Sequence, residues 1–467
     1  MALRSTLPRS TTARESISRT IKRSPAATTP ARRPSIRGSI RTTQRSELAP
    51  TTPAAAPTTP AAAPTTPAAA PTTPAAAPTT PAAALTTPAL GPDQRVALPS
   101  PSSSREATRL ADVREGRQRL GPETLQLNLT NRCNLDCVFC WNHSSLLPPR
   151  PAGWHAQRLS DPHLAAVLAD LPRLAPDHVL LSGRGEPLLH PGVEGLLEGL
   201  AELAIPVTVQ TNGTTGPTPE RLHALQVRQL HVDASAATAE GYARVHPKHG
   251  AARYRRLVAR LERLAELGVE LTLVAVIQRE NIDEILPLAR WAAQLGARRL
   301  YLKGLELRDG LEPLEALAPD PAGWRRVAEA LEQARALLDR SSVVLDCQHL
   351  EQLARGGGPR GFTSASTREA RLRRCFIGWF YLRITVDGRV MFCCKDKPVG
   401  HLDDPAGLYR LWRAPLYQAL RLAAREGDPD GEILDGVCAR CSNFAQNREV
   451  GRALAQAERS DERDRFA

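Results

Sequence analysis

Long hydrophobic runs are missing from this sequence of 467 residues. No apolar stretch approaches the about 18 consecutive residues that a transmembrane helix needs, so we expect no membrane partner. A secretory signal peptide is missing as well, and Arg32-Arg33 lacks the following apolar run of a twin-arginine export signal. The nine cysteines are an odd number, which argues against a disulfide scaffold. We therefore expect a cytoplasmic protein with reduced thiols.

Most of the chain also lacks an excess of positive charge, although the net charge is +12. Residues 1–50 hold eleven Lys or Arg and two Glu, which gives 11 − 2 = +9. Residues 51–100 hold one Asp and one Arg and sum to zero, so the remaining chain carries 12 − 9 = +3. A basic face for nucleic acid is therefore not expected on the folded part, and we expect no nucleic-acid partner.

The first 105 residues lack the pattern of a folded domain. Residues 51–92 repeat a seven-residue unit, TTPAAAP or a close variant of it. Proline within each unit disrupts helices and sheet ladders, so this period of seven is not a coiled coil. We interpret residues 1–105 as a disordered, basic and repeat-containing tail. The Arg- and Ser-rich start also fits an organelle transit peptide, but its amphipathic periodicity is weak.

From residue 125 onward, apolar strands alternate with helical patterns. The strands are expected at 125–129, 178–181, 207–210, 230–232, 269–277 and 299–302, and the helices at 161–171, 193–203, 219–227, 253–267 and 282–295. This alternation predicts a parallel sheet with outer helices. Six units are too few for a closed eight-unit barrel, so we expect a partial (β/α)6 barrel over residues 120–340. Its chemistry should lie at the carboxyl ends of the strands.

Three cysteines directly follow the first expected strand. Cys133, Cys137 and Cys140 are spaced four and three residues apart, so their thiolates can converge on one soft-metal centre. Three ligands on a four-iron cluster leave one iron free to hold a small molecule. The alternatives are a structural zinc site, with His143 as a candidate fourth ligand, and ordinary buried thiols.

The pattern Cys-x3-Cys-x-aromatic-Cys after a first strand resembles the radical S-adenosylmethionine (radical SAM) superfamily, over residues of about 125–441. The resemblance implies a [4Fe–4S] cluster on Cys133, Cys137 and Cys140 that chelates SAM through its open iron. It implies reductive cleavage of SAM to a 5′-deoxyadenosyl radical, which abstracts a hydrogen from the substrate. It also implies a one-electron donor such as a flavodoxin or ferredoxin.

Further strand ends carry motifs that match this resemblance. Gly183-Arg184-Gly185-Glu186-Pro187 follows the second strand, where the superfamily binds the amino group of SAM; Arg184 replaces a glycine of the usual motif. The resemblance places SAM beside Phe139, Gly183, Gly185, Glu186, Pro187, Thr211, Asn212, Asp233, Ser235 and Ile277. For Thr211, Asn212 and Asp233, ordinary turn chemistry remains the alternative.

A second cysteine group follows a linker rich in Gly and Ser. An Asp-Gly pair predicts a hairpin of strands 382–386 and 389–393, with a helix near 408–424 behind it. Residues 370–450 resemble the twitch domain, a short form of the SPASM domain. The resemblance assigns an auxiliary [4Fe–4S] cluster to Cys375, Cys393, Cys438 and Cys441. Cys394 can replace Cys393 and a zinc ribbon is the alternative, while Cys347 is expected to be a buried thiol.

A cluster with four protein thiolates has no open iron, so its natural role is to accept or deliver an electron. We therefore expect a net oxidation, a dehydrogenation of a small polar metabolite. The alternatives are modification of a peptide or protein, as by maturases of ribosomal peptides and sulfatases, and a non-catalytic iron–sulfur electron carrier. Lys303, Glu306 and Gln278 are candidates to face the barrel, but no catalytic base can be named from the sequence.

Overall fold

The computed structural model describes residues 103–427 and 447–459, apart from 249, 306, 308–309, 356–373, 394–396, 448 and 458. Residues 1–102, which make up nearly all of the expected tail, lie outside the described residues. So do Glu306, Cys394, Cys438 and Cys441.

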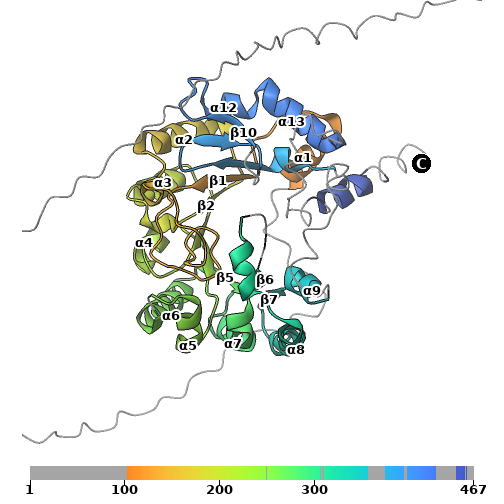
Figure 1. Cartoon of the computed structure of the whole chain (residues 1–467). Helices are drawn as coiled ribbons and strands as arrows, with labels where there is room; N and C mark the ends of the chain where they lie inside the picture. The colour runs from red at the N-terminus through yellow and green to blue at the C-terminus, as the bar shows by residue number, and fades with distance from the viewer. Residues whose placement is uncertain are drawn as a thin grey trace, which may run out of the picture. The chain divides into compact units, whose positions relative to one another are not determined.

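One ten-stranded sheet organises the described residues, in the order β10-β9-β8-β1-β2-β3-β4-β5-β6-β7 (Figure 1). The strands are β1 (Thr124–Asn128), β2 (His178–Ser182), β3 (Val207–Thr211), β4 (Gln229–Asp233), β5 (Glu270–Ile277), β6 (Arg299–Gly304), β7 (Val344–Asp346), β8 (Tyr381–Ile384), β9 (Arg389–Met391) and β10 (Pro398–His401). Strands β1 to β7 are parallel, and the open α/β fold predicted from the alternation is confirmed.

The predicted C-terminal hairpin extends this same sheet. Strand β8 pairs in parallel with β1, with Gln126 opposite Arg383, and β8 and β9 then pair antiparallel around the Asp387-Gly388 turn. The second cysteine group is thus connected to the first through backbone hydrogen bonds of neighbouring strands.

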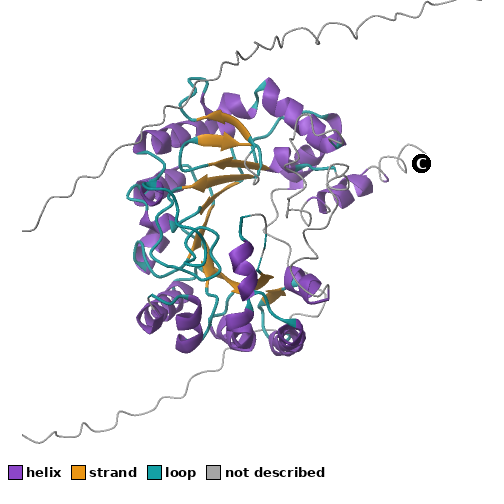
Figure 2. Cartoon of the chain, in the orientation of Figure 1, coloured by secondary structure: helices purple, strands orange, loops and turns teal. Residues whose placement is uncertain are grey.

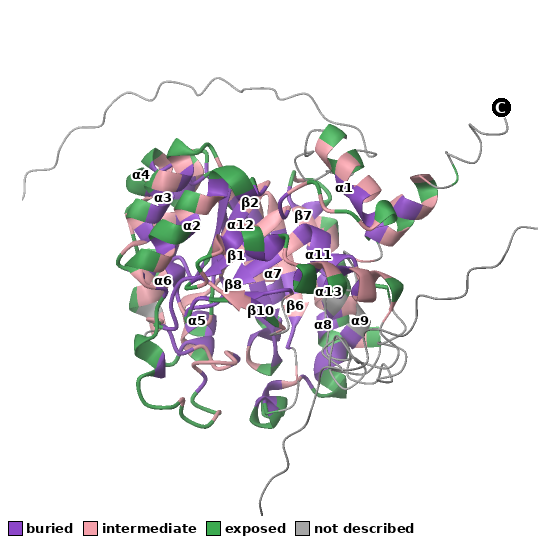
Figure 3. Ribbon diagram, turned by 90° about the horizontal axis from the view of Figure 1, so that it is seen from above, coloured by how far each residue is buried: buried purple, intermediate pink, exposed green. Residues whose placement is uncertain are grey.

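The two faces of the sheet differ in character. Leu300 and Leu302 of β6 are fully buried on one face, whereas Arg299, Tyr301 and Lys303 point to the other face. The strands form an arc, and helices cover its outer, apolar side (Figure 2). Buried residues follow the sheet and the inner faces of these helices (Figure 3). The inner side of the arc therefore carries most of the polar strand residues.

The helices are α1 (Ser103–Glu115), α2 (Asp161–Leu174), α3 (Val193–Glu202), α4 (Pro219–Ala224), α5 (Ala239–Val245), α6 (Gly250–Glu266), α7 (Ile285–Gln294), α8 (Pro321–Leu338), α9 (Gln348–Arg355), α11 (Ile377–Phe380), α12 (Gly407–Trp412) and α13 (Pro415–Glu426). Short 3-10 turns lie at η1 (Trp154–Ala156), η2 (Pro187–Leu189), η3 (Arg279–Glu284) and η4 (Glu312–Leu317). None of the helices in the described part is long and apolar enough to cross a membrane.

The helix predicted at 408–424 is wrong as a single element. It is split into α12 and α13, because Pro415 forces Ala414 into an extended conformation with ψ 148°. The prediction for α2 fits better: Ser160 caps the helix by accepting a hydrogen bond from the His163 N–H, and Pro162 occupies the first turn.

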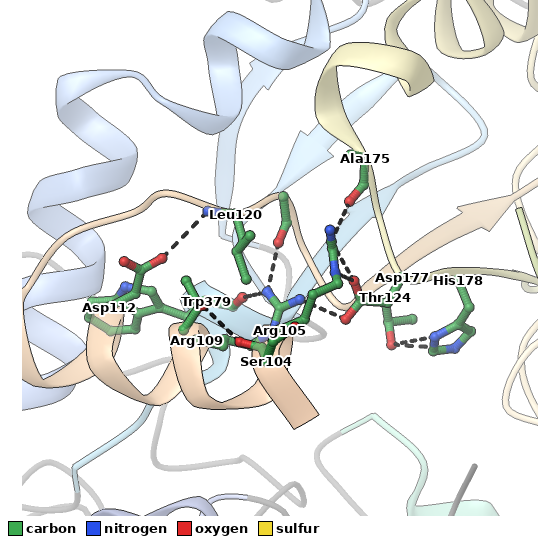
Figure 4. A network of polar contacts seen from close by, with 12 residues as sticks. Ser104, Arg105, Arg109, Asp112, Leu120, Thr124, Ala175, Asp177, His178 and Trp379 are labelled. Carbon is green, nitrogen blue, oxygen red and sulfur yellow. Dashed lines mark hydrogen bonds and ion pairs between the residues drawn. The ribbon is translucent and has the colours of Figure 1, made fainter. Parts of the chain in front are cut away.

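Helix α1 was not predicted, and it joins the sheet to the C-terminal segment. The Arg109 guanidinium is 3% exposed and donates to the carbonyls of Gly121 (2.7 Å) and Trp379 (2.9 Å) and to the Asp177 carboxylate (2.7 Å). Arg105 donates to the other oxygen of Asp177 (Figure 4). A buried guanidinium needs such complete pairing, and here its partners come from three distant segments.

Candidate active site

The cysteine loop leaves β1 at the carboxyl edge of the sheet. The Cys133 and Cys140 sulfurs accept backbone N–H bonds from Leu135 and Asn142, both at 3.4 Å. Burial raises the pKa of Cys133 to about 12 and raises the pKa of Cys137 and Cys140. Such thiols stay protonated unless a cationic centre binds them, so the loop is suited to metal ligation rather than to nucleophilic catalysis.

The hydrogen bonds around the cysteine loop bear on the kind of metal centre. His143, the candidate fourth zinc ligand, instead donates from Nε2 to the Arg184 carbonyl at 2.9 Å. The engagement of His143 elsewhere and the N–H···S bonds from Leu135 and Asn142 fit an iron–sulfur cluster with three cysteine ligands.

The Gly-Glu-Pro motif lies directly against this loop. The Gly185 N–H donates to the Thr130 carbonyl (3.1 Å), and the Glu186 N–H donates to the Arg132 carbonyl (2.8 Å). A Cβ atom at Gly185 would lie 2.2 Å from the Arg132 oxygen, so only glycine fits. The motif and the cysteine loop are therefore held together by the backbone, as their positions after neighbouring strands predict.

Glu186 connects three of the predicted motifs. Its buried carboxylate accepts from Thr211 Oγ1 (2.8 Å), Asn212 N (2.7 Å) and Leu188 N (3.0 Å). Asn212 Nδ2 in turn donates to Asn134 Oδ1 (2.8 Å) inside the cysteine loop. Burial raises the pKa of Glu186 to about 7, against the three donors, which favour the carboxylate.

Glu186→Gln is expected to lower the free energy of unfolding by about 1–3 kcal/mol, because the new amide N–H₂ group and the Asn212 N–H are both donors and face each other. The stability difference between the unchanged chain and the variant should shrink as the pH rises. A folded-state pKa near 7, above the ordinary 4.5, means that wild-type stability is lost as the pH rises from about 4.5 through 7, by up to about 3 kcal/mol.

The measurement for Glu186→Gln is the anaerobic thermal unfolding midpoint of both proteins at about pH 5 and about pH 8. Glu194→Gln is the control, since Glu194 is exposed and pairs with Arg221 on the surface. A stability difference that grows with pH would contradict the raised pKa.

The remaining predicted SAM contacts lie on β4, β5 and the cysteine loop. Ser235 Oγ donates to Asp233 Oδ1 (2.6 Å) and accepts from the Val276 N–H (3.2 Å), which ties the ends of β4 and β5 together. Ile277 is fully buried and Phe139 is 7% exposed. The negative charge of Asp233 contributes to the raised pKa of Cys137, which places this carboxylate near the loop.

Two of the four predicted auxiliary ligands are among the described residues. Cys375 precedes α11, and its N–H donates to the Ala424 carbonyl at the end of α13 (2.7 Å). Cys393 follows β9. Cys347 is 4% exposed, and burial raises its pKa to about 12, in agreement with the predicted buried thiol.

Several supporting residues were missed by the sequence analysis. Asn134 donates to Thr214 Oγ1 and accepts from Asn212 Nδ2. It lies within the cysteine motif, so its place near the site was predictable from the sequence. Glu284 holds the residues just before α5 by accepting from the N–H groups of Ala237 and Thr238. These contacts span 47 and 46 residues, so no local pattern indicates them. Asn447 donates to Cys375 Sγ (3.2 Å).

A hollow of about 510 Å³ opens beside the cysteine loop. Its lining includes Cys133, Asp136, Arg150, Lys248 and Arg253. Lys248 is exposed and Arg253 half-buried, so the rim carries positive charge close to a predicted cluster ligand.

Comparisons with known proteins agree with this geometry. The family model described as the Radical SAM superfamily matches residues 127–292. A PqqA peptide cyclase of Methylobacterium sp. (strain 4-46) is 35% identical over 311 residues, which cover 64% of this chain and 75% of the relative. The chain belongs to the radical SAM superfamily. A second family model, SPASM, described as an iron-sulfur cluster-binding domain, matches residues 375–442. The radical SAM and SPASM regions bind SAM, a SAM-coordinating [4Fe–4S] cluster and an auxiliary [4Fe–4S] cluster.

Two further relatives and one solved structure are also similar to this chain. A PqqA peptide cyclase of Ruegeria pomeroyi is 30% identical over 346 residues and covers 72% of this chain and 83% of the relative. An AdoMet-dependent heme synthase of Methanosarcina barkeri is 24% identical over 333 residues, with coverage of 68% and 88%. The crystal structure of Streptococcus suis SuiB bound to S-adenosylmethionine matches with a TM-score of 0.49 and 16% identity, covering 68% of this chain and 72% of that one.

Proposed function

We propose that this radical SAM enzyme carries out a net oxidation of a peptide. The observation that carries the proposal is the similarity to PqqA peptide cyclases, at up to 35% identity. These relatives favour the peptide-modifying alternative over the small polar metabolite expected first from the sequence. The reduced thiols and the clusters require a reducing compartment, which supports a cytoplasmic location.

When bound, SAM and its cluster supply a 5′-deoxyadenosyl radical for hydrogen abstraction, and the auxiliary cluster supplies a one-electron acceptor. In the proposal, Cys133, Cys137 and Cys140 hold the first cluster, and Cys375, Cys393, Cys438 and Cys441 hold the second. Gly183, Gly185 and Pro187 shape the backbone that receives the amino group of SAM, and Glu186 holds this backbone against Asn212. Phe139, Thr211, Asp233, Ser235 and Ile277 then surround the rest of SAM and exclude water.

Dehydrogenation of a small polar metabolite remains the second candidate, and the inner face of the sheet favours it. Gln126, His231, Tyr301, Lys303 and Arg383 share this face through the strand registers. Burial lowers the pKa of His231 to about 4, so this imidazole is neutral and available for hydrogen bonds at neutral pH. Gln278 does not belong to this face, because it is fully buried and caps η3.

The test of substrate class is 5′-deoxyadenosine formation by the cluster-loaded enzyme with SAM and a reductant. Short peptides encoded beside the gene should stimulate formation and lose two hydrogen atoms, one to the deoxyadenosyl group and one as a proton plus an electron. Stimulation by small polar metabolites alone, with unchanged peptide masses, would establish the second candidate instead.

We also propose that an acidic one-electron donor, of the flavodoxin or ferredoxin kind, approaches the hollow beside Cys133. The cationic side chains of Arg150, Lys248 and Arg253 lie on this approach. A low-potential cluster is reduced fastest from its nearest surface, and complementary charge accelerates the encounter at low ionic strength.

Lys248→Glu combined with Arg253→Glu is therefore expected to slow flavodoxin-supported SAM cleavage about tenfold at low salt. Cleavage supported by the small reductant dithionite should change little, since it needs no docking. Arg255→Glu combined with Arg256→Glu, on the exposed side of α6, is the matched control. Equal losses with both reductants would mean that the substitutions damage the cluster rather than the docking face.

A further inference from the structure

Two histidines and an aspartate meet outside the residues assigned to the clusters and to SAM. His163 lies in the first turn of α2, His401 ends β10, and Asp403 follows it. His163 Nε2 is 2.7 Å from Asp403 Oδ1, and His401 Nδ1 is 3.1 Å from Asp403 Oδ2. One ligand atom from each side chain lies within 4.8 Å of the other two. Segments 240 residues apart thus converge on one carboxylate.

The hydrogen bonds of His401 define which of its nitrogens carries a proton and which offers a lone pair to an ion. Its Nε2 lies 2.5 Å from the Asp387 carbonyl, which only accepts, so Nε2 carries the proton. Nδ1 of the neutral ring then bears a lone pair, and the Asp403 N–H points to it at 3.2 Å. The Asp403 carboxylate oxygen faces the same lone pair at 3.1 Å. Two acceptors at this distance repel each other unless a proton or a metal cation lies between them, so this pair of atoms can hold either one.

The Asp387-Gly388 turn holds both imidazoles in place. A Cβ atom at Gly388 would lie 2.8 Å from His163 Cε1 and 2.9 Å from His401 Cε1. Gly388 has φ +81°, a conformation that favours glycine, so the turn packs closely against the two rings. The ring centroids are 5.6 Å apart with an interplanar angle of 74°. The histidines are therefore positioned by the fold before any ligand arrives.

We propose that His163, His401 and Asp403 bind one zinc-type divalent transition-metal ion. Ligand atoms in a tetrahedral zinc site lie about 3.3 Å apart, given bonds of about 2.0–2.1 Å. The contacts of 2.7 and 3.1 Å reach different oxygens of Asp403, so this exposed carboxylate needs a small rotation and expansion to offer one oxygen to the ion. Two imidazole nitrogens and one carboxylate oxygen suit zinc better than the oxygen-binding Mg²⁺ or Ca²⁺. The His401 Nε2–H bond to a backbone carbonyl is the outer contact that metal-bound histidines usually make.

The ion would join α2 to the end of β10, which pairs with β9, the strand that Cys393 follows. Asp403 is 74% exposed in its side chain and His163 is 17% exposed, so the ion can enter from solvent without unfolding. Three protein ligands leave a fourth position for water. The role assigned to the ion is structural, since none of the three side chains belongs to the proposed radical chemistry.

The test uses the full chain with both clusters reconstituted anaerobically, so that the cysteines are occupied by iron. Zinc is added, unbound metal is removed, and metal content and the zinc X-ray absorption spectrum are measured. We expect one zinc per chain with only N or O neighbours at about 2.0–2.1 Å. His401→Ala and the milder Asp403→Asn should each weaken zinc binding by at least about tenfold. His223→Ala, a histidine of α4, is the matched control and should keep the zinc.

Unchanged iron content and circular dichroism in the variants show that the fold and clusters are intact. Three results would overturn the proposal: no zinc retained by the unchanged chain, full zinc retention in both His401→Ala and Asp403→Asn, or sulfur neighbours at about 2.3 Å. Any of these would leave the three residues as a hydrogen-bonded group that shares protons.

Discussion

The variant Cys133→Ala/Cys137→Ala/Cys140→Ala is expected to hold about four irons per chain after anaerobic reconstitution, where the unchanged chain holds about eight. It should form no 5′-deoxyadenosine above background. The reason is that the three cysteines are the proposed protein ligands of the SAM-binding cluster, so without them no open iron remains to bind SAM. Iron, sulfide and 5′-deoxyadenosine are measured in the same preparations.

Cys347→Ala is the control for this experiment, because Cys347 is a buried thiol that contacts Arg335 and Glu351 rather than either cysteine group. Its iron content should not change. If the unchanged chain holds only about four irons and the triple variant holds none, the C-terminal cysteines bind zinc or nothing. The electron-accepting role would then lose its basis.

Cys375→Ala is expected to separate SAM cleavage from product formation. Iron should fall from about eight to about four per chain while 5′-deoxyadenosine still forms, and the oxidised product should fall more than about tenfold. The physical reason is that Cys375 is anchored on α11 and α13, apart from the loop after β1. The two cysteine groups are nevertheless connected by one sheet, because β8 pairs directly with β1.

Asn447→Leu is a milder variant than Cys375→Ala, because it changes the surroundings of the Cys375 thiol but not the thiol itself. It removes the Nδ2 donor to Cys375 Sγ and the acceptor for the Phe376 N–H while leaving the thiol in place. It should keep the iron and shift the reduction potential of the auxiliary cluster, since hydrogen bonds to sulfur tune that potential. Full product formation by Cys375→Ala would contradict the auxiliary role.

The sequence predicted the parts of the site that lie in continuous motifs. Strand periodicity and the loops that follow each strand located Cys133, Gly185 and Asn212 at one edge of the sheet, because parallel strands share their carboxyl edge. The hydrogen bonds between these motifs were not predictable. The Glu186 carboxylate, for example, contacts Thr211, which is 25 residues away and is brought near only by the packing of the fold.

The C-terminal half shows the same limit. The Asp387-Gly388 hairpin was readable from its turn, but no local signal indicates that β8 joins the edge of β1. The break between α12 and α13 was readable in principle from Pro415 and was overlooked. The meeting of His163 with His401 and Asp403 depends on that same pairing of distant segments, so the sequence pattern contained no sign of it.

The central claim is that the hydrogen abstracted by this radical SAM enzyme comes from a peptide. The most direct test supplies the cluster-loaded enzyme and SAM with extract from deuterium-grown cells that express the chain. The extract is separated by size into peptides with proteins and small metabolites, and deuterium in 5′-deoxyadenosine is measured by mass spectrometry. We predict deuterium transfer from the peptide-containing fraction. Transfer from the small-metabolite fraction alone would contradict the claim and identify a metabolite dehydrogenase.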